Sequence, residues 1–333
     1  MKNHDTRLAD TRRTWLAAGV ALPALASLGT LLAQVKPPVV IGWLDASGRG
    51  PHALKAFNEG MAALGWKLGV QYVLEERYAD GRVERLPALA LELAAKKPVV
   101  IVAMPSASVR AAARAAPTTP VVRAGGDSPL TGLVESLARP GGMVTGVSSV
   151  SDDVSLKVIE LLVEAMPKLR RIGFLADSTS TGRDANVSNA RLAAERFRFE
   201  AVIVDMAKPE DIEPAFARLV GAKVQALVIL PATWFSAQAP KIRQLALAQH
   251  WPVVGGGAGM SRQGGLLSYG PDGLALIRRS AYYVDRILKG AKPGDLPIEQ
   301  PTTFEFVLNM KTAKLLGITI PPSIRLRATE VIE

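Results

Sequence analysis

The chain has 333 residues, a formal net charge of +10, 48% hydrophobic residues and no cysteine. This length suggests two domains of about 150 residues each, and the composition is that of a globular protein. The lack of cysteine excludes thiol nucleophiles, disulfides, thiolate metal sites and a lipid-modified cysteine near the N-terminus. Basic residues are interleaved with acidic ones, which favours a solvated basic surface over nucleic-acid binding.

The first 33 residues are predicted to be an export signal. Basic residues come first, and an uncharged Ala- and Leu-rich run follows over 15–32. This order is typical of a secretory signal, with cleavage expected near Ala26 or Ala33 and the periplasm as destination. The segment 11–16 (TRRTWL) resembles a twin-arginine signal with Trp15 at the usual Phe position. General secretion and an uncleaved anchor remain alternatives.

From residue 39 onward, short β-branched runs alternate with amphipathic stretches, which is the signature of parallel sheets built from βαβ units. Strands are predicted in the first half at 39–44, 72–77, 98–103, 120–124 and 144–147. Helices are predicted at 51–64 and 86–96, and a third runs to Ala115. Ser106 or Ser108 is expected to cap this third helix.

The same rhythm restarts after a linking helix at 155–165. Further strands are predicted at 171–176, 201–204, 226–230 and 252–255, with helices at 184–197, 209–220 and 237–249. The sequence therefore predicts an α/β protein of two doubly wound, Rossmann-like lobes with a hinge near 148–155. Because open α/β sheets bind ligands at the carboxyl ends of their strands, we expect one cleft that closes on a small solute.

Candidate ligand-binding residues follow the strands of the first lobe. The loops there offer a flexible glycine, a helix N-terminus suited to a carboxylate, and an acidic side chain suited to an ammonium group. These candidates are Asp45, Ser47, Arg49, Pro105, Ser106, Ala107, Ser108, Gly126, Asp127 and Ser128. Each loop also has a plainer interpretation as a turn or a helix cap.

The strand ends of the second lobe carry hydroxyl groups and two adjacent aromatic rings. The candidates there are Asp177, Ser178, Thr179, Thr233, Trp234, Phe235, Gly257 and Tyr269. The aromatic pair 234–235 could stack on a planar solute or could instead cover the adjoining helix. For Tyr269 the alternative is packing at the hinge, and for 177–179 it is a solvated loop.

Four segments carry a more specific signal. They are GLVESLARPGGMVTGVS at 132–148, GLLSYGPD at 265–272, YYVDRILKGAKP at 282–293 and DLPIEQP at 295–301. These segments resemble the periplasmic substrate-binding proteins of ABC transporters, in the family that includes tryptophan- and tyrosine-importer-like members. The resemblance extends over 39–333.

The resemblance implies the type I periplasmic-binding-protein fold, in which the chain crosses between the lobes three times. Residues 37–148 and 272–300 would form the first lobe, and 149–271 and 301–333 the second. Composition and periodicity do not by themselves reveal the last two crossings.

The resemblance also implies a non-enzymatic, monomeric protein that captures a small solute and delivers it to an ABC permease and its ATPase. An amino acid or a small carboxylate is the expected solute, without a cofactor, a metal or nucleic acid. The motifs H-E-x-x-H, G-x-S-x-G, S-x-x-K and Walker A are absent from the sequence. The alternatives are a periplasmic ligand-sensing subunit for a signalling receptor and an exported enzyme on the same fold.

Overall fold

The structure is a computed structural model that describes residues 37–126, 130, 132–149, 154–180, 182–232, 234–257 and 259–333. The predicted export signal lies outside the described residues, as does half of the predicted hinge at 148–155, namely residues 150–153. Residues 37–333 form one compact unit.

The first sheet is wholly parallel. Its strands are β1 (Val39–Asp45), β2 (Tyr72–Tyr78), β3 (Val100–Met104), β4 (Val121–Ala124) and β5 (Val144–Val147). They are arranged in the order β2-β1-β3-β4-β5. The strand order reverses between β1 and β3, and such a switch point is where doubly wound sheets leave a crevice at their carboxyl edge.

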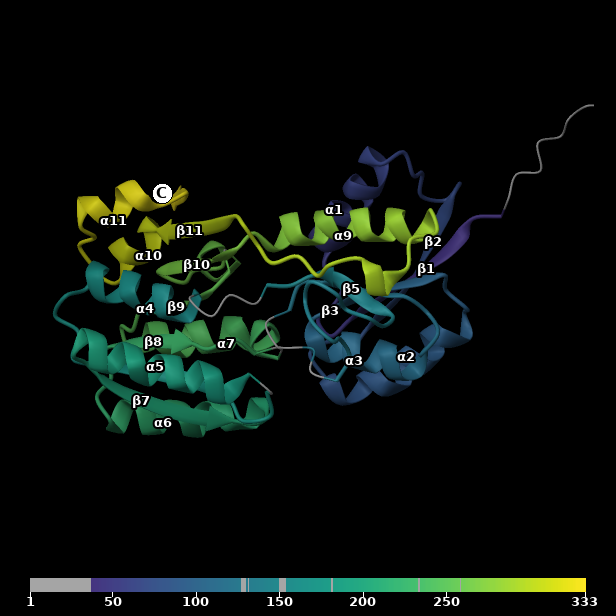
Figure 1. Ribbon diagram of the computed structural model, residues 1–333. Helices are drawn as coiled ribbons and strands as arrows, with labels where there is room; N and C mark the ends of the chain where they lie inside the picture. Colours follow the sequence, from purple (N-terminus) through teal and green to yellow (C-terminus); the bar gives the residue numbers. More distant parts are fainter. Residues whose placement is uncertain are drawn as a thin grey trace, which may run out of the picture. The chain divides into compact units, whose positions relative to one another are not determined.

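Helices cover both faces of this sheet, which explains why its strands are apolar on both sides. The helices are α1 (Pro51–Ala63), α2 (Leu86–Ala95), α3 (Ser106–Ala115) and α9 (Gly273–Leu288). Along β1, Ile41 and Trp43 pack in the core beneath α1 and α9, whereas Leu44 packs in the core beneath α2 and α3. Figure 1 shows α9, far along the sequence, lying beside α1.

The second sheet is parallel except at one edge. Its strands are β6 (Arg171–Asp177), β7 (Glu200–Met206), β8 (Ala226–Ile229), β9 (Val253–Gly256), β10 (Leu267–Pro271), β11 (Phe304–Asn309) and β12 (Glu330–Ile332). Their order is β12-β11-β10-β9-β8-β6-β7, and β11 runs antiparallel to β10. The residues after 301 therefore complete this sheet.

Helices also flank the second sheet. They are α4 (Val154–Ala165), α5 (Arg183–Phe197), α6 (Ile212–Gly221), α7 (Phe235–Ala248), α8 (Gly259–Arg262), α10 (Met310–Leu315) and α11 (Pro322–Arg327). One core lies beneath α4, α5, α10 and α11, and a second lies beneath α6 and α7.

The prediction of two doubly wound α/β lobes is confirmed by these two sheets. Predicted elements differ from the observed ones mainly at their ends. The helix expected at 209–220 is a short 3-10 turn (Pro209–Asp211) followed by α6, and the helix expected from 237 begins at Phe235. Pro240 is the sixth residue of α7 and lies beyond the four initial N–H groups that lack helical partners, so it removes one hydrogen bond of this helix.

Candidate functional site

The first strand ends in a buried carboxylate. Asp45 is the last residue of β1 and is 6% exposed. Its Oδ1 accepts a hydrogen bond from the backbone N–H of Ser47 at 2.8 Å, which makes the loop an Asx turn. Burial raises the pKa of Asp45 from 3.8 to about 6, and the hydrogen bonds from Ser47 oppose this shift only in part.

The third strand leads directly into α3. Pro105 is the N-cap residue and forms no side-chain hydrogen bond to the helix. The expected cap by Ser106 or Ser108 is therefore wrong, because both residues already lie inside the first helical turn. The Ser106 hydroxyl accepts a hydrogen bond from Arg123 Nη2 instead, and the Ser108 hydroxyl is buried without a partner in the described structure.

The fourth strand ends in a glycine turn held by a buried arginine. Arg123 is 1% exposed, and its Nε donates to the carbonyl of Gly125 at 2.9 Å while Nη2 donates to the carbonyl of Gly126. Gly126 has a φ of +110°, and a Cβ there would lie 2.8 Å from the Ser106 Oγ, so only glycine fits. Its N–H donates to the hydroxyl of Ser149 at 2.9 Å.

The aromatic pair at the start of α7 divides between two roles. The Trp234 and Phe235 rings lie 4.5 Å apart at 72°, and both are largely buried. Both belong to the core beneath α6 and α7, but only Phe235 also lines a cavity. Trp234 therefore behaves mainly as core, whereas Phe235 has a face available to a solute.

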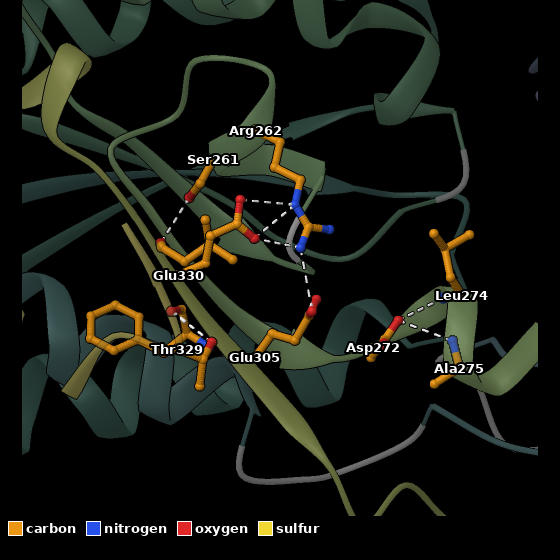
Figure 2. A network of polar contacts seen from close by, with 10 residues as sticks. Ser261, Arg262, Asp272, Leu274, Ala275, Glu305, Thr329 and Glu330 are labelled. Carbon is orange, nitrogen blue, oxygen red and sulfur yellow. Dashed lines mark hydrogen bonds and ion pairs between the residues drawn. The ribbon is translucent and has the colours of Figure 1, made fainter. Parts of the chain in front are cut away.

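The loop after β9 is fixed by a polar network (Figure 2). Ser261 is fully buried, donates to the carbonyl of Val307 at 3.1 Å, and accepts at its own carbonyl from the Asn309 side chain at 2.9 Å. Arg262 binds Glu330 at 3.0 Å and Glu305 at 3.3 Å. These bonds tie α8 to β11 and β12, and thus hold the cavity-lining residues just before Ser261 in place.

These strand ends line one cavity of about 460 Å³. Of the sequence-predicted site residues, the lining includes Asp45, Ser47, Pro105, Gly126, Phe235 and Gly257. Most of the lining comes from the carboxyl ends of strands in both sheets and the loops after them, and Val154, Met260, Leu276 and Ile277 contribute from helices α4, α8 and α9. The described lining is mainly apolar, and Asp45 is its only ionisable side chain among the described residues.

Other predicted residues lie elsewhere. Arg49 forms an ion pair with Glu76 at 2.9 Å and points into solvent. Asp177 repeats the turn of Asp45, since its Oδ1 accepts from the N–H of Thr179 at 2.9 Å. The Tyr269 ring stacks on Phe304 at 5.6 Å.

None of these, nor Ser106, Ala107, Ser108, Ser178, Thr179 or Trp234, lines the cavity as described. Asp127, Ser128 and Thr233 lie outside the described residues. A ligand-contact role for all of these residues stays a prediction.

Sequence reasoning missed most of the apolar lining. The missed residues are Met104, Ala124, Gly125, Ser149, Val154, Ile229, Leu230, Pro231, Ala232, Gly256, Met260, Pro271, Gly273, Leu276 and Ile277. Those at strand ends could have been found by the rule that had selected the polar candidates. Leu276 and Ile277 gave no such signal, because they lie on α9 and read as ordinary helix core.

The chain belongs to the family of ABC transporter substrate binding proteins, whose pattern matches residues 49–332. This is a family of solute-binding proteins rather than enzymes, and its members act outside the cytoplasm with transporter partners. Among the residues the structure describes, no helix has the length and apolarity that a membrane crossing requires.

Individual relatives agree with this family. The chain is 25% identical over 268 residues to a tyrosine-binding protein of Clostridioides difficile (strain R20291). The aligned region covers 80% of this chain and 76% of the relative. It is similar to an ABC domain from Streptococcus pneumoniae in complex with L-Trp, with 26% identity, a TM-score of 0.81, and coverage of 89% and 100% of the two chains.

A conserved domain protein from Vibrio cholerae has the same fold, with 24% identity, a TM-score of 0.81, and coverage of 88% and 99%. The expected type I periplasmic-binding-protein fold is thereby confirmed.

Proposed function

We propose that this chain is the exported solute-binding protein of an ABC importer, which captures a small solute and delivers it to the membrane permease. The observation that carries the proposal is the cavity of about 460 Å³ lined by strand ends of both sheets. Its volume lies within the range of roughly 300–1,000 Å³ that small-molecule sites occupy. The relatives described with tyrosine and L-Trp support a solute of amino-acid size.

Export to the periplasm rests on the sequence of the first 33 residues, where basic residues precede an apolar run and a twin-arginine-like segment. The mature chain works as a monomer of two lobes, 37–148 with 272–300 and 149–271 with 301–333. Three connections join the two sheets, between β5 and α4, between β10 and α9, and before β11. Such connections let two lobes close on a solute that contacts both.

The test is to identify the solute and then to block the cavity. Mass spectrometry of small molecules released from denatured, freshly purified protein identifies it, and calorimetry gives its affinity. Gly256 lines the cavity, has an ordinary backbone conformation, and would place a Cβ with nothing within 4 Å. Gly256→Phe should therefore fill the cavity without backbone strain and weaken binding by more than about 100-fold, since a filled pocket excludes the solute.

The matched control is Gly221→Phe. Gly221 also has open space around its Cβ, but it ends α6 and does not line the cavity. This variant should bind the solute like the wild type, and both variants should melt near the wild-type temperature. Full affinity in Gly256→Phe would refute the proposed site. Purification without any retained solute, together with no binding across an amino-acid panel, would refute the proposed function.

A further inference from the structure

Asp45 is a charged group placed where a solute would bind. It lies at the carboxyl end of β1, beside the switch in strand order, and it lines the cavity while being only 6% exposed. Neighbouring strands place Tyr78 and Met104 opposite it in register. A carboxylate held in this way is largely withdrawn from water, yet it still faces the space that a ligand would fill.

No protein cation compensates this carboxylate among the described residues. Its hydrogen bonds come from Ser47. The nearest basic side chain in sequence, Arg49, is engaged by both carboxylate oxygens of Glu76. Among the residues that the structure describes, the other ionisable group facing Asp45 is Tyr78, whose hydroxyl donates to Glu76 at 2.9 Å. The surroundings of Asp45 therefore add negative or neutral groups rather than a positive one.

The described lining of the cavity also lacks a basic side chain that could hold a ligand carboxylate. None of the described lining residues is Lys, Arg or His. The positions between 37 and 333 that the structure does not describe contain no basic residue in the sequence either: they are 127–129, 131, 150–153, 181, 233 and 258. Arg123, which lies behind the glycine turn, already donates to two carbonyls and to Ser106.

We propose that Asp45 binds the ammonium group of the solute, so that the ligand class is a small organic amine with an apolar body, and a carboxylate is not its anchor. This inference rests on the proposed solute-binding function. Alpha-amino acids fall within the class through their amino group, whereas carboxylates without an amine do not. The apolar body packs against Leu230, Phe235, Met260, Leu276 and Ile277, which line the same cavity.

Physical chemistry supports this pairing. A buried carboxylate without a cation is costly, and an ammonium ion at hydrogen-bond distance removes that cost through a charge-assisted bond. The raised pKa of Asp45, about 6 without ligand, reflects the uncompensated state. A bound ammonium group would lower this pKa, so amine affinity should fall as the pH drops below 6.

The experiment uses three probes that share one ring: L-tyrosine, tyramine and 3-(4-hydroxyphenyl)propionate. They carry an amine and a carboxylate, the amine alone, and the carboxylate alone. Calorimetry on the ligand-free full chain at pH 7.5 should show binding of tyramine and no binding of the propionate. At pH 5 tyramine should bind at least about fivefold more weakly than at pH 7.5, since Asp45 is then mostly protonated.

Asp45→Asn keeps an oxygen for the Ser47 N–H but removes the charge. It should weaken tyramine binding about ten- to hundredfold, the range for a hydrogen bond to a charged group, and should abolish the pH dependence. Asp285→Asn is the control. Asp285 is also largely buried, but it binds Trp66 and Lys289 away from the cavity, so affinity should not change.

Tighter binding of the propionate than of tyramine, or unchanged tyramine affinity in Asp45→Asn, would overturn the inference. So would a retained solute that has no amine, although that result would leave the proposed function standing. If no amine binds, the inference fails, and the search for retained solutes decides separately whether the proposed function fails with it.

Discussion

Replacing Asp45 by Asn should make the ligand-free protein more stable at neutral pH. Asp45 is 6% exposed, and its burial raises its pKa from 3.8 to about 6. A carboxyl group with a raised pKa binds its proton more tightly in the folded state than in the unfolded state. Its ionised form therefore opposes folding, and removing the charge should relieve that cost.

The size of the effect follows from the pKa. One pKa unit corresponds to about 1.4 kcal/mol, so the change from 3.8 to about 6 corresponds to ~3 kcal/mol of lost stability when Asp45 is ionised. This loss is complete above the folded-state pKa near 6 and absent below 3.8. We expect the free energy of unfolding of Asp45→Asn to exceed that of the wild type by about 2–3 kcal/mol at pH 8 and to match it near pH 4.

Urea denaturation from pH 4 to pH 8 measures this difference directly. Subtracting the wild-type free energy of unfolding from that of the variant at each pH cancels the contributions of the other titrating groups. Working without ligand avoids stabilisation by binding. Asp285→Asn supplies the opposite case. Burial alone would raise the pKa of Asp285, but hydrogen bonds from Lys289 and Trp66 and the positive charge of Lys289 lower it. That variant should be less stable than the wild type at pH 8. A stability difference for Asp45→Asn that is constant with pH, or negative at pH 8, would refute the reasoning.

Two further substitutions test the packing. Trp234→Ala should lower the free energy of unfolding by about 3–5 kcal/mol, as for other buried aromatic residues, because Trp234 packs in the core and against Phe235. Thermal denaturation measures this effect, and an unchanged melting point would contradict a core role. Gly60→Ala should destabilise the protein by about 1–3 kcal/mol by overpacking, because its Cβ would lie 2.5 Å from the Arg278 carbonyl oxygen across the α1–α9 contact. Gly221→Ala, which meets nothing, should instead be neutral or stabilising in the same chemical denaturation assay.

Most of the fold could be predicted from the sequence because parallel strands buried on both faces are nearly continuous apolar runs. The run at 39–44 contains such a pattern and forms β1 almost unchanged. Periodicity could not show that α9 returns to the first sheet, since its partner α1 lies more than 200 residues earlier. That contact is a tertiary one, and only the resemblance to a family implied it.

The candidate site was predictable where a polar residue ended a strand, and much less so elsewhere. Asp45 ends β1, Ser47 lies two residues beyond it, and both line the cavity. Arg49, two residues further on, instead forms an ion pair with the partly buried Glu76. The apolar lining from α9 could not be distinguished from helix core without knowing which way the helix faces.

The two sheets provide an internal comparison that bears on the role of Asp45. Each first strand ends in an aspartate that is 6% exposed and accepts from the N–H two residues later, Asp45 from Ser47 and Asp177 from Thr179. Asparagine forms the same turn, so the turn alone does not require a carboxylate. What the carboxylate adds at Asp45 is charge, and because burial disfavours that charge, it raises the pKa of Asp45 and costs stability when no cation is bound. A cationic solute offsets that cost only while it is bound, so the same group that weakens the empty protein would favour the loaded one.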